Sequence, residues 1–154
     1  MEIESIRNYL QISERMASSG QPEESEFNYI AKAGYQVIIN LAMPNSDFSI
    51  PEEGYIVSVL KMTYVHIAVP FDAPEISHLK EFIKLLHVYE SKKIWIHCAL
   101  NYRVSAFLYL YKTVIQSESP QQAMSVMLPS WQPNSVWQAF MAIPREHILN
   151  DQPC

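Results

Sequence analysis

The stretch that decides the fold of this chain reads Ile94-Trp95-Ile96-His97-Cys98-Ala99-Leu100-Asn101-Tyr102-Arg103-Val104-Ser105. Its first residues are mostly bulky and apolar, which predicts a buried strand over residues 93–97. Residues 104–115 are strongly apolar and predict a helix, so only a short turn separates the two elements. A buried strand that runs through a tight turn into a helix is typical of layered α/β folds.

Strands and helices also alternate on both sides of this stretch. We expect strands within residues 9–19, 37–41 and 64–69, and helices over residues 23–33, 52–61, 74–91 and 120–129. A last helix should begin after Asn134 and be kinked by Pro144. The length of 154 residues suits one domain with a sizeable core. The alternation therefore predicts a single α/β domain over residues 1–154, with a mainly parallel central sheet flanked by helices.

Composition limits the classes of function. The formal net charge of −5 argues against broad binding of nucleic acids or anionic membranes, although it is compatible with a locally basic pocket. The chain has no apolar run long enough to span a membrane and no signal-like N-terminus. Its two cysteines, Cys98 and Cys154, do not suggest a disulfide framework. We therefore expect a cytoplasmic protein with no membrane or nucleic-acid partner, and the sequence predicts no oligomeric state.

The spacing of potential ligands argues against a metal site. The chain has neither Cys-x-x-Cys nor His-Glu-x-x-His, and His66, His78, His87 and His147 show no ligand spacing with one another or with a cysteine. It also lacks a glycine-rich loop of the nucleotide-binding type. We expect neither a metal nor a cofactor.

The turn after residue 97 has the parts of an anion site. A strand–turn–helix unit aims free backbone N–H groups into one concavity, and the helix N-terminus adds partial positive charge. Cys98, at the end of the strand, faces this positive field, which favours the nucleophilic thiolate. Arg103, at the start of the helix, can hold phosphate oxygens with its planar guanidinium. These residues predict a site that binds a phosphoryl group and attacks it with sulfur.

This string resembles the signature of the protein-tyrosine-phosphatase superfamily, His-Cys-x-x-Gly-x-x-Arg-Ser/Thr. The chain is also similar to a bacterial, dual-specificity-like branch, a small phosphatase-like domain found in some proteins beside a β-lactamase-like hydrolase. The matching segments follow in order at residues 17–22, 35–41, 64–67 and 96–98. The resemblance implies a phosphatase-like fold and hydrolysis of a phosphomonoester through a phosphocysteine intermediate.

The signature loop departs from this pattern in two ways. The pattern has five residues between cysteine and arginine, whereas four stand between Cys98 and Arg103, and Asn101 replaces the glycine. Asparagine enters positive φ more readily than most residues. Either the loop is shortened and Arg103 takes the arginine role, or no gap exists, Ser105 takes the hydroxyl position and Val104 replaces the arginine. We favour the first alignment, because Arg103 is the only nearby cation.

The resemblance also assigns roles to individual residues. Cys98 attacks phosphorus, Arg103 holds the equatorial oxygens, and Asp72, after the strand at residues 64–69, protonates the leaving group. His97 fixes the backbone of the cysteine, and Ser105 hydrogen-bonds the departing sulfur. The expected phosphate-binding loop comprises His97, Cys98, Ala99, Leu100, Asn101, Tyr102, Arg103 and Ser105.

Three of these residues also have structural interpretations. Asp72 equally suits an N-cap for the helix that opens at Pro74. For Ser105 we favour a hydrogen bond back to the preceding turn. Tyr102 either stacks on a substrate or fills the space of the missing residue.

Two functions therefore stay open. The first is a cysteine-dependent phosphatase that acts on a phosphorylated small molecule or a phosphoprotein. The second is a phosphate-binding module without turnover, a sensor or scaffold that holds phosphate or sulfate, which the shortened loop favours. A redox role for Cys98 is less favoured, because no resolving cysteine lies nearby in the sequence.

Overall fold

A five-stranded sheet forms the centre of the computed structural model, which describes residues 2–150. The strands are β1 (Leu10–Ser13), β2 (Met16–Ser19), β3 (Val37–Asn40), β4 (Thr63–His66) and β5 (Ile94–His97), in the order β1-β2-β5-β3-β4. β1 and β2 form an antiparallel hairpin, and the other three neighbouring pairs are parallel. The mainly parallel sheet expected from the sequence is confirmed. Cys154 lies outside the described residues.

β5 lies in the middle of the sheet and is buried on both faces. All of its residues are buried, and so are those of its neighbours β2 and β3. This burial explains why these strands have no alternation of apolar and polar residues. Because β3, β4 and β5 are parallel, the loops that follow them meet at one edge of the sheet.

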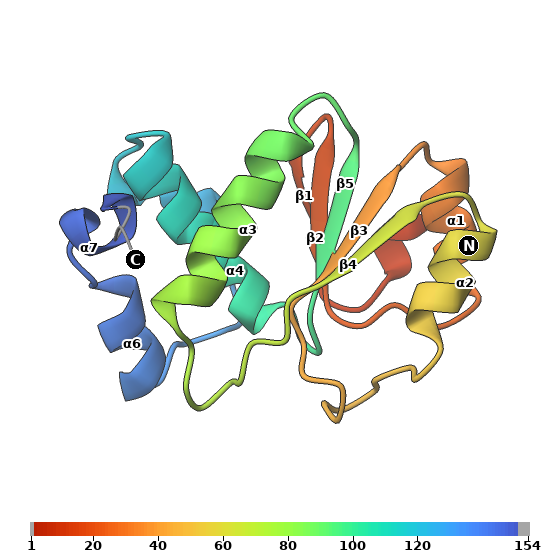
Figure 1. Ribbon diagram of the computed structural model, residues 1–154, viewed down its shortest axis with the longest axis horizontal. Coiled ribbons are helices and arrows are strands. Elements are labelled where there is room, and N and C mark those ends of the chain that lie inside the picture. The colour runs from red at the N-terminus through yellow and green to blue at the C-terminus, as the bar shows by residue number, and fades with distance from the viewer. Residues whose placement is uncertain (1, 151–154) are drawn as a thin grey trace.

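Helices cover both faces of the sheet (Figure 1). On one side lie α1 (Glu26–Lys32) and α2 (Glu53–Val59), and on the other lie α3 (Ile76–Val88), α4 (Tyr102–Leu110), α6 (Ser135–Met141) and α7 (Arg145–Leu149). Shorter elements are α5 (Pro120–Ala123), the 3-10 turns η1 (Ile3–Ser5) and η3 (Met124–Val126), and the π-helical turn η2 (Tyr111–Ile115). The predicted α/β class, with helices flanking the sheet, is therefore confirmed.

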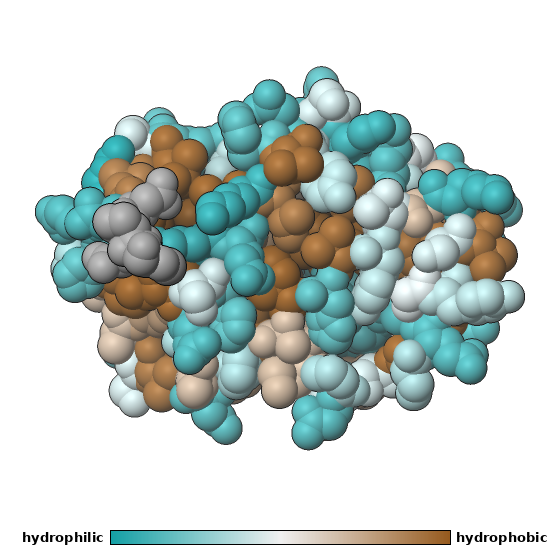
Figure 2. All heavy atoms as spheres, viewed as in Figure 1, coloured by the Kyte–Doolittle hydropathy of each residue, from teal (hydrophilic) through white to brown (hydrophobic). Residues whose placement is uncertain are grey.

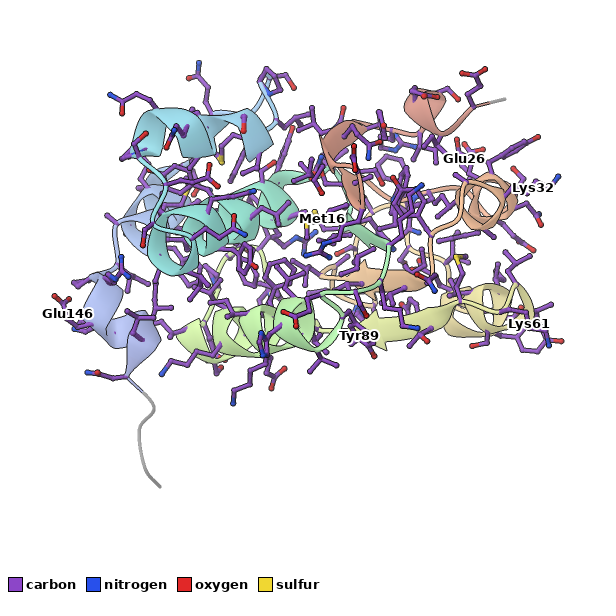
Figure 3. All side chains as sticks on the ribbon, turned by 90° about the horizontal axis from the view of Figure 1, so that it is seen from above. Met16, Glu26, Lys32, Lys61, Tyr89 and Glu146 are labelled. Atoms are coloured by element: carbon purple, nitrogen blue, oxygen red, sulfur yellow. The ribbon has the colours of Figure 1, made fainter. Side chains whose placement is uncertain are left out.

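The core has one apolar cluster on each side of the sheet. In the larger cluster α3 packs on α4, with the ring centroids of Phe82 and Phe107 5.6 Å apart, and side chains fill the space between these helices (Figure 3). The smaller cluster packs α1 and α2 around Trp95. On the face of the molecule seen in Figure 2, hydrophilic residues are interspersed with hydrophobic ones. Each helix in residues 2–150 is too short or too polar to cross a bilayer.

Several predicted helix boundaries were wrong. α4 begins at Tyr102, two residues earlier than expected, and its last turn is π-helical rather than α-helical. The helix expected over residues 120–129 is only a single turn followed by a 3-10 turn. Pro144 does not kink the last helix, because α6 ends at Met141 and α7 starts separately at Arg145. A proline inside a helix loses a hydrogen bond and clashes with the preceding turn, so a break is favoured there.

Candidate active site

Cys98 follows β5 at the edge of the sheet where three loops meet, and its side chain is fully buried. It borders a cavity of about 350 Å³. Three segments line this cavity, namely the loop after β3, the loop after β4, and the turn into α4. The lining residues are Met43, Asn45, Ser46, Asp47, Phe71, Cys98, Ala99, Leu100, Tyr102 and Arg103.

The backbone of the turn carries donors without acceptors. Among residues 2–150, no acceptor takes a hydrogen bond from the backbone N–H groups of residues 99–104. These groups belong to the turn and to the first turn of α4, where N–H groups have no partner within the helix. Their partial positive charge, together with the helix dipole, gives this backbone the chemistry to bind an anion.

Asn101 stands where the signature has glycine, and it adopts the left-handed conformation with a φ of 70°. Its side-chain amide donates to the Asn8 carbonyl at 2.8 Å and to the Ser18 hydroxyl at 3.1 Å. The Asn8 amide in turn donates to the Leu100 carbonyl at 2.9 Å. These bonds tie the turn to β2 and to the N-terminal segment, so the turn is held in a conformation that asparagine tolerates better than most residues.

The Arg103 side chain is 5% exposed and reaches the cavity wall. One terminal nitrogen donates to the Val69 carbonyl at 3.0 Å, and the other lies 3.5 Å from the Ser46 hydroxyl. Its Nε has no partner among residues 2–150. A buried N–H without an acceptor costs free energy. Val104, which takes the arginine position in the other alignment, is fully buried in the core. Of these two residues, Arg103 is therefore the one that borders the cavity.

His97 is fully buried and contacts an acceptor with each ring nitrogen. Nδ1 lies 3.1 Å from the Cys98 carbonyl oxygen, and Nε2 lies 2.6 Å from Oε2 of Glu53. The other Glu53 oxygen accepts from Gln21 at 2.7 Å. Burial by itself raises the pKa of the Glu53 carboxyl, but the charge of His97 and the hydrogen bonds from His97 and Gln21 outweigh burial, so the pKa lies below its ordinary value.

The Ser105 hydroxyl is used within the fold. It donates to the Asn101 carbonyl at 2.7 Å and accepts from the Leu128 N–H at 3.0 Å. The bond back to the preceding turn is therefore present, and the single hydroxyl proton is taken. Ser105 does not line the cavity, and its role at the departing sulfur stays a prediction.

Two aspartates lie on the loops around the cavity, but only one lines it. Asp72 is exposed and is not a lining residue, although its neighbour Phe71 is. Asp72 does not cap α3 as the sequence suggested, because Glu75 holds the N-cap position. Asp47 lines the cavity next to Ser46. The acid role of Asp72 stays a prediction, and Asp47 is a second candidate that sequence reasoning missed.

Aromatic rings form one wall of the cavity. Tyr102 lines the cavity and stacks on Trp131, with ring centroids 5.1 Å apart and planes within 5°. The ring centroids of Phe71 and Tyr102 lie 6.3 Å apart. Within residues 2–150, no group of three or more His, Cys, Asp or Glu side chains is arranged to hold a metal ion.

Residues 5–139 match the model of a family described as a DSP-PTPase phosphatase fused to NAD+ kinase. The chain belongs to this family. Membership in the DSP-PTPase family makes this a phosphatase-like protein with a dual-specificity-type domain, and the resemblance stated from the sequence is confirmed. No curated protein matches the sequence.

Solved structures resemble this DSP-PTPase domain over nearly its whole length. A phosphatase-like DUF442 protein of Shewanella putrefaciens CN-32 is 32% identical, with a TM-score of 0.80 over 90% of this chain and 91% of that one. Tk-PTP in its active form is 22% identical, with a TM-score of 0.72 over 86% and 92%. TpbA of P. aeruginosa is 14% identical, with a TM-score of 0.72 over 94% and 92%. At these lower identities, the last two show the fold alone.

Sequence reasoning missed the contribution of the loop after β3 to this cavity. Ser46 and Asp47 come from that loop, and Glu53 follows it at the start of α2. One signal was present, because loops after neighbouring parallel strands share an edge of the sheet and commonly form sites there. Nothing in the sequence marks Glu53 as buried.

Proposed function

We propose that this protein is a cysteine-dependent phosphatase that hydrolyses a phosphomonoester, either a phosphorylated small molecule or a phosphoprotein. One observation carries the proposal. Arg103, a buried arginine, lines the same cavity as Cys98, and so do Ala99, Leu100 and Tyr102 of the turn, whose backbone N–H groups have no acceptor among residues 2–150. Together they offer donors for the charge that develops on the phosphoryl oxygens.

The proposed reaction has two steps. The thiolate of Cys98 attacks phosphorus, the bond from phosphorus to the leaving oxygen breaks, and that oxygen takes a proton from an aspartic acid beside the cavity. A water molecule then attacks the phosphocysteine, gives its proton to the aspartate, and releases inorganic phosphate with the thiolate restored. Arg103 holds the equatorial oxygens in both steps.

The test is hydrolysis of p-nitrophenyl phosphate by the wild type and by Cys98→Ser. We expect the substitution to lower kcat at least ~10³-fold, because it removes the nucleophile itself. Cys154→Ser is the matched control and should hydrolyse at the wild-type rate. Equal rates for the wild type and Cys98→Ser would refute the proposal.

A second candidate is a phosphate-binding module without turnover. The spacing of four residues between Cys98 and Arg103 favours it, and so do the existing bonds from Arg103 to Val69 and Ser46, which leave fewer donors for a transition state. In this case Arg103→Ala should weaken binding of inorganic phosphate by ~10–100-fold in calorimetry, because a charge-assisted bond is lost. Arg145→Ala, on the exposed face of α7, is the control. Hydrolysis that depends on Cys98 would decide against this candidate.

A further inference from the structure

Glu53 and His97 form a buried pair behind the cysteine, which the two proposed steps do not use. Their exposed fractions are 2% and 0%, and the carboxylate oxygen lies 2.6 Å from Nε2. Glu53 is the first residue of α2, whereas His97 is the last residue of β5 and precedes Cys98. The pair therefore connects a helix on one face of the sheet to the backbone of the nucleophile.

The contacts of the pair define where its protons lie. The Cys98 carbonyl oxygen can only accept, so Nδ1 of His97 must donate to it. The Glu53 carboxylate is an acceptor 2.6 Å from Nε2, and Gln21 donates to its other oxygen, so Nε2 donates as well. An imidazole that donates from both nitrogens carries a positive charge. Gln21 donates to the remaining Glu53 oxygen, which completes the partners of the carboxylate.

We propose that Glu53 is a positioning residue that keeps His97 doubly protonated, so that the imidazolium holds the Cys98 carbonyl and stabilises the Cys98 thiolate. This inference deepens the proposed function, because it concerns the same cysteine. The ion pair is neutral as a whole, but its positive end lies next to Cys98 and its negative end lies farther away, at α2. Such a dipole acts strongly in a buried environment, where solvent screens it little.

Side chains from β4 and α1 also face the pair formed by Glu53 and His97. From β4, Tyr64 and His66 lie near Glu53. From α1, the apolar ring of Phe27 meets His97 edge-on, with ring centroids 6.3 Å apart. The substitution and its control must therefore leave these three residues unchanged.

The first test reads the protonation of His97 directly and needs no turnover. In ¹⁵N-labelled protein near pH 7, with the His97 signals assigned by comparison with His97→Asn, we expect both ring nitrogens to have the chemical shifts of imidazolium. A neutral His97 in the wild type would overturn the inference, whatever the phosphatase assays show. Failure of this inference and failure of the proposed function are thereby distinguishable.

The second test measures the rate of Cys98 alkylation by iodoacetamide against pH, in a Cys154→Ser background. Glu53→Gln keeps an acceptor for Nε2 but removes the charge, so we expect the midpoint of alkylation to move up by ~1 pH unit, with a roughly 10-fold slower rate below it. Glu52→Gln makes the same change at the adjacent exposed residue and should leave the midpoint in place. An unchanged midpoint in folded Glu53→Gln would overturn the inference. If Glu53→Gln does not fold, Glu53→Asp takes its place. This variant keeps the negative charge, so its alkylation midpoint should equal that of the wild type. A midpoint raised by the ~1 pH unit expected for loss of the charge would contradict the positioning role of Glu53.

Discussion

Arg103 and Val104 show how much depends on a single position in the shortened loop. One step along a helix turns a side chain by ~100°, and here that step separates a guanidinium on the cavity wall from an aliphatic side chain in the core. Asn101 adopts positive φ and α4 begins directly after it, so that Arg103 is the second residue of the helix. Arg103 is then held in place by Val69 and Ser46 from two other loops.

The identity of the general acid is also decided at the scale of single residues. We expect Asp47→Asn to lower the rate on phenyl phosphate by ~10²-fold and the rate on p-nitrophenyl phosphate much less, because a poor leaving group depends more on protonation. Asp47 lines the cavity and Asp72 does not. Steady-state rates on both substrates check this, with Glu81→Gln on the outer face of α3 as control. A larger effect of Asp72→Asn on phenyl phosphate would instead support the role that the family resemblance assigns to Asp72.

Among the elements, the end of β2 limits the shape of the cysteine turn. Gly20 follows this strand so closely that an added Cβ would lie 2.6 Å from the Ala99 carbonyl oxygen and 3.2 Å from the Leu100 Cα atom. Both contacts are with backbone of the turn, which cannot move without changing the directions of its N–H groups. The glycine is therefore required by close approach between two segments rather than by its own φ.

Gly20→Ala should accordingly disturb the proposed anion site. We expect a loss of ~1–3 kcal/mol in the free energy of unfolding, as for other overpacking substitutions, and weaker binding of inorganic phosphate. Urea denaturation and calorimetry measure the two effects. Gly54→Ala in α2 is the matched control, since the three atoms nearest to its Cβ would all belong to the Tyr64 ring, the first at 3.2 Å. Phosphate affinity that is equal in both variants would contradict the close-approach argument.

At the scale of the whole molecule, the buried polar groups around Glu53 couple stability to pH. Burial raises the pKa of the Tyr64 hydroxyl to about 12, and the Glu53 carboxylate adds to this effect. A group whose folded pKa exceeds its unfolded value binds its proton more tightly in the native state. Its contribution is therefore complete below the unfolded value of about 10 and is lost as the pH rises toward the folded value.

Tyr64→Phe should remove this contribution to the alkaline loss of stability. Between about pH 9 and pH 11, we expect the wild type to lose ~0.5–1 kcal/mol more unfolding free energy than the variant, after a discount for the partial exposure of the side chain. Urea denaturation at several pH values checks the slope. Tyr55→Phe, at a residue that is 72% exposed, should keep the wild-type slope. Parallel slopes for the wild type and Tyr64→Phe would show that Tyr64 does not titrate differently in the folded state.

The sequence by itself determined the elements that short-range pattern controls. The apolar runs at residues 37–41 and 93–97 predict buried strands, and β3 and β5 are buried throughout. Alternation of strands and helices predicts the mainly parallel sheet, and the residues around Cys98 resemble a phosphatase signature, which the family match confirms. These features were predictable because they depend on neighbouring residues and on spacing within one segment.

Only the tertiary structure decided which distant residues meet at the cysteine. Asp47, Val69 and Glu53 lie far from Cys98 in the sequence, yet Asp47 shares its cavity, Val69 binds Arg103, and Glu53 binds His97. The physical reason is the order of the sheet, because β5 lies beside β3 and brings the loop after that strand to the turn that carries Cys98. Burial of Glu53 likewise depends on how α2 packs on the sheet, and no local pattern encodes that packing.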